Sequence, residues 1–288
     1  MTVSEVIIRL RVGFFSLIVM AMSLLVGQAT NAETVAVKFA EGATHGFLTL
    51  RSASGQSLAQ GELIQQVHAE RVDSRLVFHF KDGSLHDERV SFSQEKVFTM
   101  LTYQLVQRGP SFPHSLDISM DRRTGEYVVR SRPGADQSEE VIKGRIDLPP
   151  DVSNGMTVAL LRNLPPGKNH TVQFVAFTPE PKLIDLMLLA IGDETVMVGD
   201  LAKTATRYSL APQLNAITRF FGTLLGKLPD DFYYHFWILT DEVPAFARFE
   251  GPLYLMGPAW RIELVSPRLP GKGDGQAVQM TIWSITML

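Results

Sequence analysis

The feature that most constrains the fold is a repeated alternation of apolar and polar residues, in short runs that end at Gly, Pro, Asp or Ser. Successive side chains of a β-strand point to opposite faces of a sheet, so this pattern predicts antiparallel strands. Asp82-Gly83 separates two such runs and residues 121–125 separate two more, which predicts two hairpins. The expected fold class is mainly β: a curved, half-barrel-like antiparallel sheet with one or two short helices.

Two segments interrupt the alternation. Pro149-Pro150-Asp151 has residue types favoured at the start of a helix, and apolar residues follow it, so a short helix is expected between Leu148 and Leu164. Residues 213–228 also carry apolar residues at helical spacing, but the two glycines among them weaken a helix there.

The first 32 residues have the character of a secretory signal peptide. A net positive start precedes an apolar run at 12–26, and a small, polar stretch ends at Ala32. The apolar run is shorter than the roughly 20 residues that a spanning helix needs. We therefore expect a periplasmic or secreted protein, cleaved after Ala32 or after Ala29. Retention as an uncleaved N-terminal anchor is the alternative.

Composition narrows the classes of function. The chain has no cysteine, which excludes disulfides, thiol nucleophiles and an acylated N-terminal cysteine. A formal charge of −3 without charge runs argues against nucleic acid as a partner. No phosphate-binding loop or dinucleotide fingerprint is present, so no cofactor is expected. The mature chain divides into an N-terminal β portion, 33–147, and a C-terminal β portion with the short helix, 148–288, in one domain or two.

One cluster of polar residues is compatible with serine hydrolysis. Ser111, His114 and Asp117 lie close together in the sequence. Triad members normally converge from separate segments, however, and no Gly-x-Ser-x-Gly motif occurs. We therefore expect no catalytic residue and no enzyme, with a serine or metal-dependent hydrolase kept as the less favoured alternative.

A second cluster is compatible with metal binding. A two-residue turn at Asp82-Gly83 would pair His79 with His86 on one sheet face, with Glu88 diagonal to His79. Two imidazoles and a carboxylate suit zinc or iron. Arg75 and Lys81 on the same face would repel a cation, and a register change of one residue would separate the pair. We expect no metal site.

Three segments of the second half carry a family resemblance. They are Leu148-Pro149-Pro150-Asp151, Gly192–Val196, and a region with Trp237, Asp241 and Pro244–Gly251. Through them the chain resembles an uncharacterised family of exported bacterial proteins, classed as a domain of unknown function. That family is similar in fold to the periplasmic lipoprotein carriers LolA and LolB, so the resemblance implies a curved sheet around an apolar ligand. Where the family has Gly and Tyr after Leu-Pro, this chain has Asp151-Val152-Ser153.

Aromatic side chains gather between Tyr233 and Trp260, and both faces of the run at 231–239 are aromatic. A strand covered on both faces or a groove for an acyl chain would each have this composition. The candidate ligand-binding residues are Tyr234, Phe236, Trp237, Phe246 and Trp260. With the resemblance, they predict a non-enzymatic envelope protein that binds an apolar small molecule, a lipid or a lipidated partner. A structural module that binds another envelope protein is the alternative, and any membrane association is expected to be peripheral or through an uncleaved signal.

Overall fold

The computed structural model describes residues 32–134, 137–165, 167–177, 180–212 and 234–265, and the structural statements below concern these residues. They form fifteen strands in one open sheet and a single short helix, which confirms the mainly β, antiparallel prediction. The first eight strands are β1 (Thr44–Ser52), β2 (Ser57–His68), β3 (Arg71–Phe80), β4 (Leu85–Ser93), β5 (Thr99–Arg108), β6 (Ser115–Asp121), β7 (Glu126–Arg132) and β8 (Glu140–Arg145). The remaining elements are β9 (Val152–Ser153), α2 (Thr157–Asn163), β10 (His170–Phe177), β11 (Pro181–Val198), β12 (Leu201–Pro212), β13 (Tyr234–Leu239), β14 (Ala245–Gly251) and β15 (Trp260–Val265).

The sheet is two meanders joined through the first and last strands. Strands β1 to β8 follow one another in space, as do β9 to β15, and β15 pairs antiparallel with β1. The β9–β10 pair is the parallel one, and it joins just two residues of each strand. Both β portions of the chain therefore belong to one continuous sheet.

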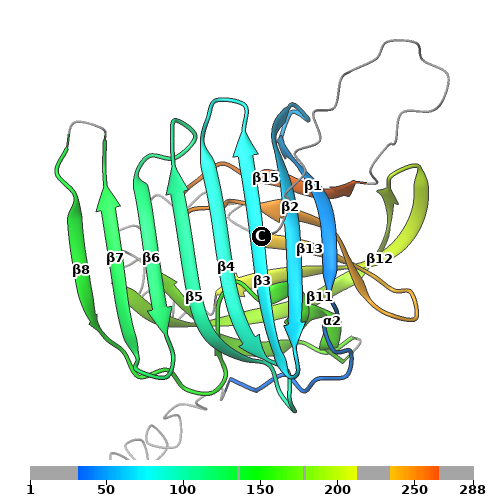
Figure 1. The fold of residues 1–288 in the computed structure, drawn as a ribbon. Coiled ribbons are helices and arrows are strands. Elements are labelled where there is room, and N and C mark those ends of the chain that lie inside the picture. Colours follow the sequence, from blue (N-terminus) through cyan, green and yellow to red (C-terminus); the bar gives the residue numbers. More distant parts are fainter. Residues whose placement is uncertain (1–31, 135–136, 166, 178–179, 213–233, 266–288) are drawn as a thin grey trace, which may run out of the picture.

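The sheet folds over on itself, so its two halves face each other. Figure 1 shows β1–β8 upright in front, with β11–β15 running across behind them. We call these halves the front layer and the rear layer. Side chains from both layers and from α2 fill a main core, which includes Val72, Phe92, Met100, Leu160 and Leu188. A second, aromatic cluster lies where β1 meets β15 and consists of Leu48, Leu50, Ala59, Phe78, Phe80, Phe112, Phe249, Trp260 and Ile262.

The hairpin at Asp82-Gly83 exists, but its register differs from the predicted one. The loop has three residues, Lys81 to Gly83, and Gly83 adopts a positive φ of 85°. A three-residue loop with glycine in that conformation is a common alternative to the two-residue turn. As a result His86 pairs with Phe78, and His79 pairs with Leu85. The predicted His79–His86 pair is therefore wrong.

The helix starts later than predicted. Residues 149–156 form turns and the short strand β9, and α2 begins at Thr157. The Arg122 guanidinium donates hydrogen bonds to the carbonyl oxygens of Leu148, Pro149 and Val152, at 2.7–2.9 Å. These carbonyls thus accept hydrogen bonds from a side chain in the turn between β6 and β7, and not from helical amides. The other predicted helix, 213–228, lies outside the described residues.

Candidate functional site

Four of the five candidate aromatic residues lie on the inner face of the folded sheet. Tyr234 and Phe236 are half-buried and pack against both the main core and the aromatic cluster. Phe246 packs against the aromatic cluster, and Trp260 belongs to it. The Trp260 ring lies 5.4 Å from Phe80, measured between centroids. The structure therefore brings these four residues to the space between the layers.

Trp237, the fifth candidate, points to the opposite face. It belongs to a separate small cluster with Val196 and Ala247. Its indole Nε1 donates to Glu194 Oε2 at 2.8 Å, and the Arg248 guanidinium lies 5.4 Å from its ring centroid. A cation over an indole ring and a satisfied N–H hold the side chain on the outside of β13. Trp237 therefore does not line the interior.

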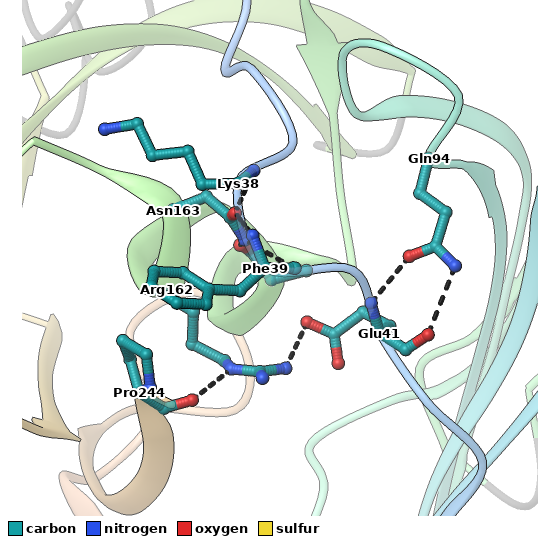
Figure 2. Close-up of polar contacts among 8 residues, drawn as sticks. Lys38, Phe39, Glu41, Gln94, Arg162, Asn163 and Pro244 are labelled. Atoms are coloured by element: carbon teal, nitrogen blue, oxygen red, sulfur yellow. Dashed lines mark hydrogen bonds and ion pairs between the residues drawn. The ribbon is translucent and has the colours of Figure 1, made fainter. Parts of the chain in front are cut away.

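The residues before β1 form a strap, residues 33–41, that fastens the two layers together (Figure 2). The Asn163 side chain accepts hydrogen bonds from the amides of Lys38 and Phe39, at 2.8 and 2.7 Å, and donates to the Phe39 carbonyl at 3.2 Å. The Glu41 amide donates to Gln94 Oε1, in the β4–β5 connection, at 2.6 Å. Asn163 is 1% exposed, so these bonds form away from water.

A buried ion pair completes this joint. The Arg162 guanidinium donates to Glu41 Oε1 and, at 2.5 Å, to the carbonyl of Pro244 in the β13–β14 connection. Burial raises the pKa of Glu41, although the charge of Arg162 opposes that effect. Removing one member of a buried pair typically destabilises a protein by about 3–5 kcal/mol, because the other charge is left unpaired. Arg162 therefore joins the strap and α2 to the β13–β14 connection.

Between the main core and the aromatic cluster, the inner face of the front layer keeps accessible surface. Five half-buried residues make up this inner patch: Leu63, Gln65, Ser74, Leu76 and Glu88. Leu63, Leu76 and Glu88 stand directly opposite one another across β2, β3 and β4. The adjacent row of inner residues, on the side of the aromatic cluster, is buried: Phe78 is 0% exposed, and His86 and Gln107 are each 3% exposed. The inner patch is thus less covered than the residues around it.

Glu88 is the charged residue of the inner patch. Tyr103 donates a hydrogen bond from its hydroxyl to Glu88 Oε1 at 2.9 Å. Burial raises the pKa of Glu88, and that hydrogen bond opposes the rise. The pKa of Tyr103 is raised as well, by burial and by the nearby carboxyl. Glu88 is therefore largely enclosed by protein while it keeps some accessible surface.

His86 adjoins Glu88 on the same face of β4, two residues earlier. Its Nδ1 lies 3.0 Å from Gln107 Nε2, and Gln107 Nε2 also donates to the carbonyl of Leu253 at 2.7 Å. Its Nε2 is buried and has no hydrogen-bond partner among the described residues. Burial lowers the pKa of His86 to about 4, so the imidazole is neutral near pH 7. The ring lies against Phe78 and Phe112, at centroid distances of 6.3 and 6.4 Å.

The residues of the two alternative chemistries lie apart. His79 is exposed on the outer face of the sheet, whereas His86 lies on the inner face. The Ser111 hydroxyl donates to Asp82 Oδ2 at 2.7 Å, and no hydrogen bond joins Ser111, His114 and Asp117, all of which the structure describes. Within the described ranges, no group of three or more His, Asp or Glu side chains is arranged to hold a metal ion.

The outer face of β2–β5 carries a shallow depression of about 570 Å³. The arginines that line it are all paired: Arg75 and Arg89 both bond to Asp87, and Arg71 bonds to Asp73. Although burial acts against the carboxylate, hydrogen bonds from the two arginines lower the pKa of Asp87 to about 2. Each arginine of the depression thus already has a carboxylate partner.

Comparison with protein-family models, with characterised proteins and with solved structures found no match for this chain. None of the helices in the described part of the chain has the length and apolar character required to cross a bilayer.

The sequence did not single out Glu88, His86 and Gln107 as interior residues. From the sequence, Glu88 and His86 are candidates only for metal binding, and no pattern distinguishes Gln107 or Tyr103. The sequence signal for these interior residues is the set of alternate residues His86, Glu88, Val90 and Phe92, which share one face of β4. Two of them are polar although the other two make that face apolar. Polar residues on an apolar face are the informative exception in a strand.

Proposed function

We propose that this protein is an exported, non-enzymatic protein of the cell envelope that binds an apolar ligand, a lipid or the acyl chain of a lipidated partner between its two layers. The observation that supports the proposal is the inner patch, where apolar side chains keep accessible surface in the middle of the folded sheet. Tyr234 and Phe236 from the rear layer, and Leu63 and Leu76 from the front layer, all pack against the same aromatic cluster. Covering such surface with an acyl chain contributes about 0.8 kcal/mol per buried methylene.

The test uses a pair of neighbouring residues on opposite faces of β2. Leu63 points inward, and Ile64 points to the outer face. Leu63→Trp should fill the interior space and abolish binding of the apolar fluorophore 1-N-phenylnaphthylamine, whereas Ile64→Trp should bind it as the wild type does. Organic extraction of the protein purified from the periplasm should also recover lipid.

The carrier proposal is wrong if the wild type neither binds the fluorophore nor releases lipid on extraction. Co-purification of a partner chain without lipid would then favour the alternative, a structural module that binds another envelope protein.

A further inference from the structure

We propose that the interior site takes an amphiphile with an uncharged hydrogen-bonding end, such as an alcohol or an amide, and that Glu88 and His86 bind that end. This inference rests on the proposed function, because it names the chemical class of the same ligand. It is carried by two polar groups that lie side by side on the inner face of β4 and are incompletely satisfied by the protein.

The first group is the Glu88 carboxyl. Tyr103 is the hydrogen-bond donor that reaches it, at Oε1, and no second hydrogen bond to Glu88 is found in the part of the chain that the structure describes. A carboxyl has room for several hydrogen bonds, and leaving a buried polar group unsatisfied costs free energy. Glu88 pairs with Leu76, which pairs in turn with Leu63, so a ligand that covers these leucines would lie beside the carboxyl.

The second group is His86 Nε2. It is buried and has no hydrogen-bond partner among the described residues, while Nδ1 contacts Gln107 on the other side of the ring. A neutral imidazole has one nitrogen that donates and one that accepts. Glu88 and His86 therefore offer a donor and an acceptor together, which suits a hydroxyl or amide group that can both donate and accept.

The charges around the site favour an uncharged end. The inner positions of β2–β5 carry no Lys or Arg, and Arg75 and Arg89 project from the outer face, where they bond to Asp87. A carboxylate or phosphate next to Glu88 would therefore find no lysine or arginine on the inner face of these four strands to offset its charge. Burial holds His86 in its neutral form at pH 7, so this ring does not supply the missing positive charge.

The experiment compares three ligands with the same chain: dodecanol, dodecane and laurate, each displacing 1-N-phenylnaphthylamine from the mature protein. Glu88→Met replaces the carboxyl by an apolar chain of similar length. It should lower the ratio of dodecanol to dodecane affinity by about tenfold, the worth of one hydrogen bond to a buried group. Taking the ratio cancels the cost of transferring the chain from water. Glu62→Met removes a carboxylate from the outer face of β2 and should leave the ratio unchanged.

Laurate should bind the wild type more weakly than dodecanol and should gain affinity in Glu88→Gln, which keeps the size of the side chain but not its charge. If Glu88→Met does not fold, the infrared carboxylate band of Glu88, identified by its loss in Glu88→Gln, should shift when dodecanol binds. An unchanged dodecanol-to-dodecane ratio in Glu88→Met, no band shift, or tightest binding of laurate by the wild type would overturn the inference and leave the apolar site standing. Failure of all three ligands to displace the fluorophore would instead contradict the proposed function.

Discussion

At the scale of single residues, the pair formed by Glu88 and Tyr103 can be separated from its surroundings. Tyr103→Phe removes the donor to Glu88 and leaves the enclosed carboxyl without it, so we expect a loss of about 1–3 kcal/mol in unfolding free energy. The double variant Glu88→Met/Tyr103→Phe replaces both partners by apolar groups and should unfold close to the wild-type midpoint. Urea denaturation of the wild type, both single variants and the double variant measures this cycle. Additive losses would show that the two side chains do not interact.

His86 predicts how stability depends on pH. Its pKa is about 4 in the folded chain and near 6.5 when unfolded, so between these pH values only the unfolded chain binds the proton. The unfolding free energy should therefore fall as the pH drops from 6.5 to 4, by about 3 kcal/mol in total, relative to His86→Gln. Glu41 and Glu88, with raised pKa values, contribute with the opposite sign, but both proteins contain them. Parallel stability curves for the two proteins between pH 4 and 6.5 would contradict the assignment.

At the scale of elements, the strap depends on one amide side chain of α2. Asn163→Ala should leave the amides of Lys38 and Phe39 unpaired, at about 1–3 kcal/mol for each buried group. Amide hydrogen exchange of residues 35–41 should then accelerate while exchange in β6 and β7 stays slow. Asn154 is the matched control, because it is also buried but donates to the Val175 carbonyl in β10, so Asn154→Ala should leave exchange in the strap unchanged. Equal acceleration in both variants would show that the strap is not fastened by Asn163.

The strands could be predicted from the sequence, but the hairpin register and the start of the helix could not. Alternation and turn residues identify strands because burial on one face acts on every second residue, and the hairpin at Asp82-Gly83 is recognisable for that reason. The register of this hairpin cannot be recognised from the sequence, because Gly83 fits a three-residue loop as well as a two-residue turn. The length of the loop decides whether His79 and His86 share a face of the sheet. The start of α2 depends on Arg122, which lies well before the helix in the sequence and donates hydrogen bonds to the carbonyls of Leu148 and Pro149. Local propensity at Pro149 carries no information about that contact.

At the scale of the whole molecule, the fold of the sheet onto itself decides which aromatic residues reach the interior. Both faces of β13 carry aromatic side chains, so either face could line the interior. Only the packing of the rear layer against the front layer determines that Phe236 points inward and Trp237 outward. Period-2 patterns specify alternate faces but not which face is inner. The position of the inner patch likewise depends on how two distant layers meet.

Because both layers share one sheet and one main core, we expect the described fold to unfold as a single cooperative unit. Pairing of β15 with β1 joins the layers, and the main core takes side chains from β3 to β7 as well as from β9 to β13. Two probes report on different layers: residues 33–147 contain no Trp, whereas Trp237 and Trp260 lie in the rear layer, and the third tryptophan, Trp283, lies outside the described residues. Tryptophan fluorescence should therefore give the same urea midpoint as hydrogen exchange of peptides from β6 and β7. Two layers that fold as separate domains would give different midpoints, since neither layer would then need the other to bury its apolar face.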